Sequence, residues 1–373
     1  MTFSLTEEQE AIQESTRGVM EGKSRARDCF DGGSSLDGGL WKALVEMGVS
    51  GLGLGEAGGG LEAGLIDMAL VAEESGRVAA AVPFLSTTVM SGVLLSGLAG
   101  APAMELARSI SAGDSIAATA VHGHRNNGPA VAAVLAADRR WRLSGEIPFL
   151  VGAELADRLV VPAAAEGAAG LYLVEVPDAG VTTAELPTLD PTRRAASVIL
   201  EDASALRLDE KDDVEELLEL AAMRADVVLA AEALGAASSA LDMSTDYALN
   251  RSQFGRPIGQ FQAVKHTLAD MFVDVENARS ATYNAAWAYD ELGAGAALDV
   301  AMAKGLATEN AVSVINRSIQ IHGGIGVTWE HDLHILLRRA KSCSLLFGEP
   351  GEQFERIAAA LLDVEHVATP PSP

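Results

Sequence analysis

The chain has 373 residues, of which 49% are apolar and only 5% aromatic, and its formal net charge is -25. This length predicts two or three subdomains rather than a single core. The acidic balance excludes nucleic acid and anionic membrane surfaces as partners, because proteins that bind many phosphates carry a basic footprint. Anionic ligands must therefore be held by a few well-placed cations.

The N-terminus and the cysteines predict a soluble cytoplasmic protein. Thr6 and the acidic residues at 7–10 are typical of a capped helix start, and no signal peptide is indicated. The most apolar stretch, around residues 89–98, is too short to span a bilayer. Cys29 and Cys343 supply neither a metal-binding set nor a disulfide framework.

Residues 1–112 predict a helical N-terminal domain. Apolar residues recur at helical spacing in the stretches 41–48 and 65–76. The glycine-rich stretch 51–60 lies between them, and no strand leads into it as a phosphate-binding G-x-G-x-x-G turn would require. We therefore interpret it as a loop between helices.

The remaining chain changes character twice. Residues 113–205 contain short β-branched runs separated by Gly, Pro, Asn and Asp, which predicts a small all-β domain. Residues 206–365 carry long stretches of helical periodicity rich in Ala, which predicts a helical bundle. Residues 366–373 are rich in Pro, and we expect them to form a disordered tail.

Two segments within the predicted bundle indicate a phosphate-bearing cofactor. The stretch from Arg251 to Met271 combines a fixed cation, a tight turn at Gly255 and the start of a long helix. Gln-Ile-His-Gly-Gly-Ile-Gly follows at 320–326. An arginine can neutralise a phosphate bidentately, and a glycine pair lets the backbone approach a phosphate closely.

The helix–β–helix order and these segments resemble the acyl-CoA dehydrogenase superfamily over essentially the whole chain. The matching motifs are Leu5-Thr-Glu-Glu-Gln9, Trp41-Lys-Ala-Leu44 with Gly48, Glu73-Glu-Ser-Gly-Arg77, Tyr247 through Met271, and Gln320 through Gly326. The resemblance implies an N-terminal helical domain, a small β-barrel or sandwich, and a C-terminal four-helix bundle. It also implies FAD as cofactor, an acyl-CoA thioester as substrate and an electron-transfer flavoprotein as electron acceptor.

In this family FAD lies extended at a subunit interface, and the resemblance assigns six residues to it. These are Arg251 at the pyrophosphate, Phe254 near the adenosine or ribityl portion, Gln262 at the phosphate–ribose region, and Gln320, Gly323 and Gly324 on the adenine and pyrophosphate side.

The chemistry also needs a carboxylate that removes the α-proton of the thioester, and here the sequence departs from the family pattern. The family's usual Glu position is occupied by Gly348, and Glu349 comes one residue later. The alternative position on the preceding helix is Ala225. Glu349 is the candidate base that remains, and Glu232 is a weaker one on the same helix as Ala225.

The β-domain departs from the family pattern too. Phe149 keeps an aromatic surface where the family covers the flavin, but Val151 replaces the hydroxyl residue that hydrogen-bonds the ring. His122 and His124 lie close in sequence without further metal-ligating residues nearby, so no metal site is expected.

The nucleotide-end motifs are thus intact while the positions for the flavin ring and the base are altered. This asymmetry resembles the heteromeric α2β2 acyl-CoA dehydrogenases of actinobacteria, which often act on steroid side-chain CoA thioesters. The favoured hypothesis is a subunit that completes the FAD site of a partner chain. The alternatives are a self-sufficient homotetramer that uses Glu349 and a non-catalytic assembly subunit that binds no flavin.

Overall fold

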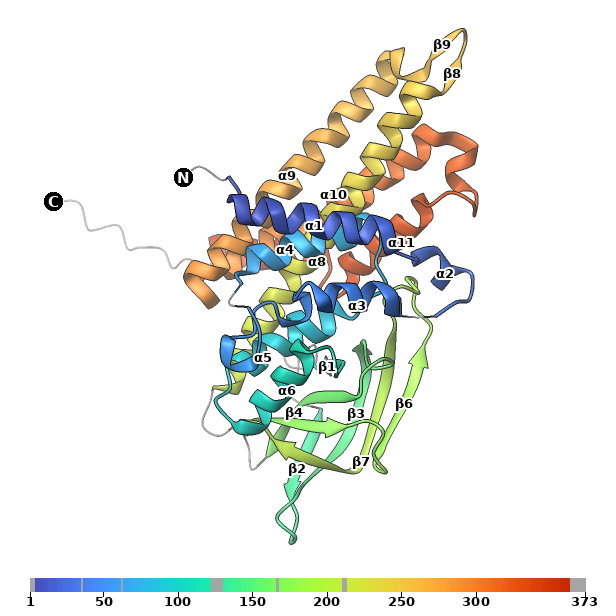
Figure 1. Cartoon of the computed structure of the whole chain (residues 1–373). Helices are drawn as coiled ribbons and strands as arrows, with labels where there is room; N and C mark the ends of the chain where they lie inside the picture. Colours follow the sequence, from blue (N-terminus) through green and yellow to red (C-terminus); the bar gives the residue numbers. More distant parts are fainter. Residues whose placement is uncertain are drawn as a thin grey trace, which may run out of the picture.

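A computed structural model of the protein describes residues 4–34, 36–61, 63–121, 130–165, 168–209 and 213–362. The predicted tail at 366–373, together with His122 and His124, lies outside these residues. Figure 1 shows helices first, then a small β-domain, then a long helical bundle. The predicted fold class, mostly α with a central β-domain, is confirmed.

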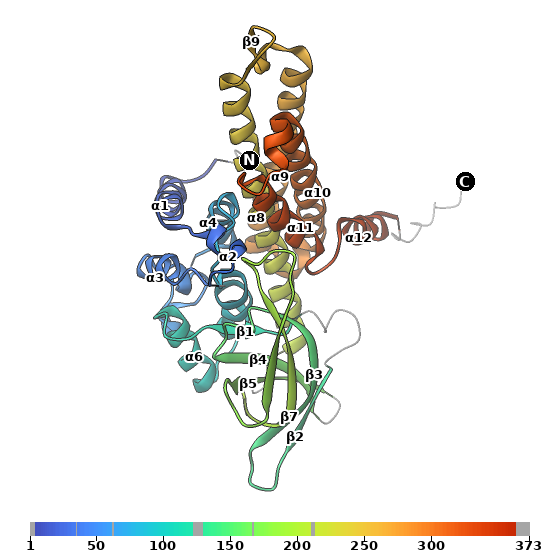
Figure 2. The same cartoon turned by 90° about the vertical axis from the view of Figure 1, so that its right-hand side faces the viewer.

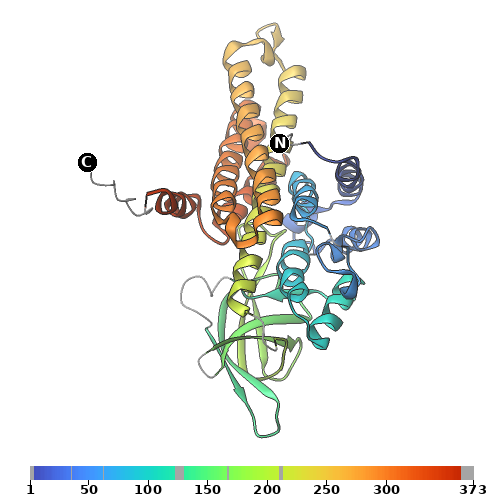
Figure 3. The ribbon, with the colours of Figure 1, turned by 90° about the vertical axis from the view of Figure 1, so that its left-hand side faces the viewer.

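The N-terminal helices lie along one side of the bundle and the β-domain (Figures 2 and 3). They are α1 (Glu7–Lys23), α2 (Ala26–Phe30), α3 (Gly38–Glu46), η1 (Val49–Gly51), η2 (Glu56–Gly58), α4 (Leu65–Arg77), η3 (Phe84–Ser91), α5 (Gly92–Ser96) and α6 (Ala101–Ser111). The predicted helix start is confirmed, because the side chains of Thr6 and Gln9 accept each other's backbone N–H groups. The glycine-rich stretch is a connection that holds only the short turns η1 and η2, as predicted.

The β-domain is a small barrel. Its strands are β1 (Ala117–Thr119), β2 (Val131–Leu135), β3 (Trp141–Val151), β4 (Arg158–Ala165), β5 (Ala168–Glu175), β6 (Val181–Leu186) and β7 (Ala195–Arg207). Pairings run β4–β2–β3–β7–β5 and return to β4, which closes the ring. β1 pairs with β4, and β6 pairs with β7.

The sequence pattern did not predict β6 and β7. β6 has no buried residue, so its sequence lacks the alternation that marks a half-buried strand. β7 is interrupted by Glu201 and Asp202, and Asp202 has a left-handed backbone with φ +55°. Both strands form because they pair with neighbours that a local pattern does not reveal.

The C-terminal part is the predicted helical bundle. Its elements are α8 (Val214–Asn250), β8 (Ser252–Gln253), β9 (Arg256–Pro257), η4 (Ile258–Gln260), α9 (Gln262–Leu292), η5 (Gly293–Ala296), α10 (Ala297–His322), η6 (Gly323–Val327), α11 (Leu333–Leu345) and α12 (Pro350–Leu362). Helix α8 is the central element and contacts α4, α9, α10 and α11. It therefore joins the N-terminal helices to the rest of the bundle.

Helices α4 and α8 cross at two glycines. A Cβ atom added at Gly235 would lie 1.9 Å from the carbonyl oxygen of Glu73, and one at Gly76 would lie 2.0 Å from that of Glu232. The two backbones approach this closely only because neither glycine carries a side chain.

We expect Gly235→Ala to lower the free energy of unfolding by about 2 kcal/mol, because the methyl group forces the two helices apart. Gly18→Ala is the matched control. Gly18 lies in α1, and a Cβ atom there would meet nothing within 4 Å. That change should be neutral or stabilise by up to about 1 kcal/mol, since Ala favours helix. Equal urea midpoints for the two variants would contradict the close-packing argument.

Candidate functional site

Arg251 lies at the far tip of the bundle, where α8 ends and the β8–β9 hairpin begins (Figure 1). Its backbone N–H donates to the Tyr247 carbonyl at 2.8 Å, and its carbonyl accepts from the Ile258 N–H at 2.8 Å. Its side chain is exposed, and none of the described carboxylates pairs with the guanidinium. A fixed backbone thus presents a cation that remains available to a ligand.

Phe254 is the most exposed aromatic residue at this tip. Its side chain is 91% exposed and its φ of +55° is unusual for a residue other than glycine. Its ring contacts Phe261 edge-on, with the centroids 6.2 Å apart. A large apolar surface held outward on a strained turn is typical of a contact with a ligand or another chain.

Gln262 is the first residue of α9, so it sits beside backbone N–H groups that have no partner within the helix. Such a helix start favours an anion. The Gln262 side chain is exposed, as is that of Gln320 in the last turn of α10. Both side chains can therefore reach a molecule outside the chain.

Gly323 and Gly324 follow directly after α10. Gly323 has φ +63°, and a Cβ atom added at either glycine would meet nothing within 4 Å. The backbone here is open to a close approach. The Tyr247 ring stacks on His322, with centroids 4.5 Å apart, so the ends of α8 and α10 lie together. The structure therefore brings the Arg251 segment and the Gly323 segment to the same end of the bundle.

A second feature lies where the β-domain meets the bundle. A cavity of about 300 Å³ opens there. Its walls come from the ends of β3 and α11 and from the β6–β7 connection: Phe149, Val151, Pro187, Thr188, Leu189, Asp190, Arg193, Ser342, Leu345, Leu346 and Phe347. The aromatic and aliphatic walls suit a flat apolar ring, and Val151 offers no hydroxyl donor to it.

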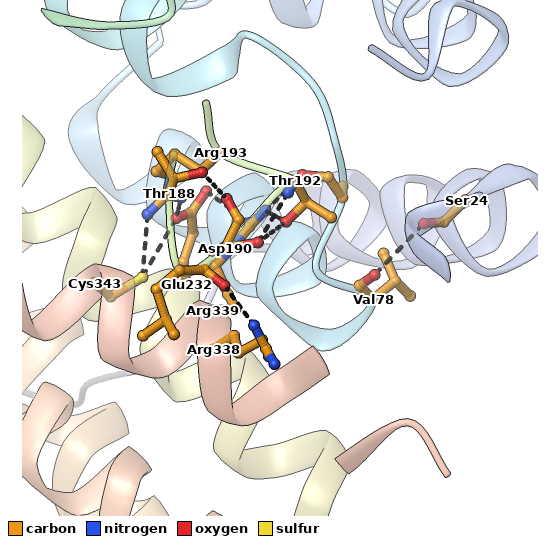
Figure 4. A network of polar contacts seen from close by, with 12 residues as sticks. Ser24, Val78, Thr188, Asp190, Thr192, Arg193, Glu232, Arg338, Arg339 and Cys343 are labelled. Atoms are coloured by element: carbon orange, nitrogen blue, oxygen red, sulfur yellow. Dashed lines mark hydrogen bonds and ion pairs between the residues drawn. The ribbon is translucent and has the colours of Figure 1, made fainter. Parts of the chain in front are cut away.

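Four charged residues, Asp190, Arg193, Glu232 and Arg339, form a buried cluster at the wall of this cavity (Figure 4). Arg339 Nε donates to Asp190 Oδ2 at 2.8 Å, and its Nη1 lies 3.7 Å from Glu232 Oε1. Arg193 forms an ion pair with Glu232 and lies 3.4 Å from Cys343 Sγ. All four charged side chains are at least nine-tenths buried.

Asp190 shows how this cluster depends on pH. Burial opposes its ionisation, but the adjacent guanidinium groups of Arg339 and Arg193 outweigh that effect and hold the pKa of Asp190 below its usual value. A lowered folded-state pKa stabilises the fold above the unfolded pKa of about 3.9. This stabilisation is lost as the pH falls through the folded-state pKa.

The cavity and the tip are far apart within one chain. Glu232, which pairs with the cavity residue Arg193, and Arg251 lie nineteen residues apart along the continuous helix α8. At about 1.5 Å of rise per residue the separation is about 28 Å.

The candidate base positions hold no group poised for proton abstraction. Glu349 is exposed at the start of α12, where its carbonyl accepts from the Gln353 N–H, and it does not line the cavity. Ala225 is fully buried. Glu232 is buried but is engaged by two arginines, and Gly348 has no side chain to offer.

Sequence reasoning missed Asp190, Arg193 and Arg339. The Asp190-Pro-Thr-Arg-Arg194 run was a usable signal, because an Asp side chain often accepts a hydrogen bond from the backbone two residues on. This turn is present, since the Thr192 N–H donates to Asp190 Oδ1. Charged residues in a connection are usually exposed, however, and their burial depends on helices distant in sequence.

Two negative findings concern the described part of the chain. No helix in it is long and apolar enough to cross a membrane. Its His, Cys, Asp and Glu side chains form no group of three suited to a metal ion.

Comparisons with known proteins agree with this architecture. Models of the acyl-CoA dehydrogenase N-terminal and C-terminal domains match residues 6–101 and 219–362. Acyl-CoA dehydrogenase IpdE2 of Mycolicibacterium smegmatis is 32% identical over 359 residues, which cover 95% of this chain and 99% of that protein.

Two solved structures are similar over nearly their whole length. The ChsE4-ChsE5 complex from Mycobacterium tuberculosis contains a chain with TM-score 0.86 and 29% identity, covering 97% of this chain and 99% of that one. A variant of the Tcur3481-Tcur3483 steroid ACAD gives TM-score 0.84 and 29% identity, with coverages of 96% and 98%. The chain therefore belongs to the acyl-CoA dehydrogenase family, whose members are FAD-dependent oxidoreductases that act on CH–CH bonds.

Proposed function

We propose that this chain is an acyl-CoA dehydrogenase subunit that completes the FAD site of a second, different acyl-CoA dehydrogenase chain in a heterotetramer. The observation that carries the proposal is that Gly348, Ala225 and Val151 stand where the base and the hydroxyl contact to the flavin ring are expected, while the residues suited to the nucleotide end are present and exposed. In FAD the first phosphorus lies no more than about 11 Å from the ring, since seven bonds of about 1.5 Å join them. The separation of about 28 Å along α8 between Glu232, which pairs with the cavity residue Arg193, and Arg251 is much longer, so we expect two chains to hold the two ends of one FAD molecule.

The residues at the tip suit the nucleotide half of FAD. Arg251 would hold the pyrophosphate as a bidentate donor, and the open backbone at Gly323 and Gly324 would admit it closely. Gln262 would bind the phosphate–ribose region beside the start of α9, with Gln320 on the adenine side and Phe254 against the adenosine or ribityl portion. All of these side chains are exposed, as contacts to a cofactor shared with another chain require.

The chain's own cavity does not suit catalysis. When bound, FAD supplies the acceptor for the hydride that leaves the β-carbon of the acyl thioester. The proton at the α-carbon needs a carboxylate, yet Gly348 and Ala225 occupy the two family positions for it. Val151 offers no hydrogen bond to the ring. The base and the ring contacts are therefore assigned to the partner chain.

The similar structures fit a two-chain assembly, because the names of both join two proteins, and one is called a steroid ACAD. We accordingly propose a CoA thioester of a steroid side chain as the substrate class and an electron-transfer flavoprotein as the electron acceptor.

The test is to purify the chain alone and then co-expressed with a second acyl-CoA dehydrogenase chain from the same genome. We expect a colourless chain alone and a yellow complex with about one FAD per pair of unlike chains. A yellow homotetramer that reduces an acceptor with acyl-CoA would instead establish the self-sufficient alternative. If neither the chain alone nor the complex contains flavin, the chain would be a non-catalytic assembly subunit.

Glu349→Gln separates the two catalytic alternatives within the complex. Glu349 is exposed and does not line the cavity, so we expect kcat and KM for acyl-CoA to stay within about twofold of the parent values. A fall in kcat of about a hundredfold or more, the usual scale for loss of a general base, would assign proton abstraction to Glu349. Glu352→Gln, in the first turn of the adjoining helix α12, is the matched control.

A further inference from the structure

The buried charged cluster joins all three parts of the fold. Asp190 and Arg193 come from the connection between β6 and β7, Glu232 from α8 and Arg339 from α11. Arg339 also donates from Nη2 to the Ala80 carbonyl at 2.9 Å, just beyond α4. Figure 4 shows these side chains converging from separate segments.

The cluster is electrically balanced, with two guanidinium groups and two carboxylates. Thr192 completes it, because its hydroxyl hydrogen-bonds to Asp190 and lies 2.7 Å from Arg339 Nη2. Desolvated charges are tolerated when each has an opposite charge and further hydrogen bonds. Removing one partner leaves an uncompensated charge in the interior, which is far more costly than removing a complete pair.

Arg193 also fills space beside the cavity. Its side chain and Val151 line both the cavity of about 300 Å³ and a second void of about 30 Å³ on the N-terminal helix side. Arg193 and Val151 therefore contribute to the walls of both spaces. The guanidinium is turned to Glu232 and Cys343 behind the cavity wall.

We propose that Asp190, Arg193, Glu232 and Arg339 form an interdomain clamp that holds the β-domain on the bundle without a flavin ring in this chain's own cavity. The clamp takes over the junction where catalytic chains would carry the ring. It keeps the chain in the shape that presents its tip to the partner. The last part of this inference rests on the proposed function, whereas the pairing itself does not.

The test is a thermodynamic cycle on the purified chain without added flavin. Arg193→Met and Glu232→Met should each lower the urea midpoint of unfolding by about 1 M, because each strands a buried charge. The double variant should regain at least half of the summed loss, since methionines fill the space and the two charges that remain, Asp190 and Arg339, pair with each other. Arg194→Met is the matched control, because Arg194 is the next residue and pairs with the more exposed Glu185. Its midpoint should move by no more than about 0.3 M.

A second readout uses the complex with its partner chain. The FAD content and the visible absorption spectrum should be the same in the parent and the double variant. The clamp would be overturned if the double variant lost as much in urea midpoint as the two single variants lose together. A shifted flavin spectrum at unchanged FAD content in the double variant would show instead that Arg193 contacts a flavin. Should the methionine variants not fold, Glu232→Gln and Arg193→Lys test the same coupling at smaller cost.

The two proposals fail in different ways. A yellow chain in the absence of the partner contradicts the proposed function but leaves the stability cycle intact. Stability losses that simply add in the double variant contradict the clamp, whatever the flavin content of the complex.

Discussion

Replacing Arg251 with Met is expected to weaken FAD binding by the assembled complex about a hundredfold. The guanidinium is exposed and unpaired among the described residues, so its whole bidentate capacity is available to the pyrophosphate. Loss of a charge-assisted pair of this kind costs about 3 kcal/mol, and every 1.4 kcal/mol is a factor of ten in affinity. The measurement is the FAD dissociation constant of the apo-complex, followed by flavin fluorescence.

Two further variants make this prediction specific. Arg251→Lys keeps the charge but loses the planar fork, so an intermediate loss of about tenfold is expected. Arg140→Met removes an exposed cation from the turn between β2 and β3 and should leave FAD affinity unchanged. If Arg251→Met and Arg140→Met bound FAD equally well, Arg251 would not contact the pyrophosphate.

Replacing Lys304 with Met is expected to lower the free energy of unfolding by about 4 kcal/mol. Lys304 on α10 is fully buried, and its Nζ donates to the Cys343 carbonyl at 2.6 Å and the Leu346 carbonyl at 2.9 Å. These carbonyls lie at the C-terminal end of α11, where a cation is favoured by the helix dipole. Without the ammonium they remain buried without a donor, at about 1–3 kcal/mol each.

The effect should extend to the wall of the cavity. The loop after α11 contains Phe347 in a left-handed conformation with φ +61°, and both Leu346 and Phe347 line the cavity. We expect faster amide hydrogen exchange at residues 344–349 in Lys304→Met, together with a lower urea midpoint. Lys341→Met removes an exposed lysine of α11 and serves as the control. Unchanged exchange in both variants would show that Lys304 does not hold the loop.

Local sequence signals were sufficient for much of the architecture. The capping pair of Thr6 and Gln9 and the apolar periodicity of α9 depend on residues a few positions apart, so they can be recognised without knowledge of the fold. The strands β6 and β7 could not be recognised in this way, because their stability comes from pairing and not from a periodic pattern of their own.

The candidate site divides in the same way. Arg251, Phe254 and Gln262 are close in sequence and lie on one turn and one helix start, so the motif and the cofactor class were recognisable together. Their exposure, and the distance from the tip to the cavity, depend on how the long helices pack.

The sequence by itself therefore determined the order of the three parts and the family, and it supplied the proposal for the residues at the nucleotide end of FAD. Only the tertiary structure decided that Asp190, Glu232 and Arg339, from three distant segments, meet as one buried cluster beside Arg193. The physical reason is that a buried charge is acceptable only beside its counter-charge, and that pairing arises when separate elements pack together.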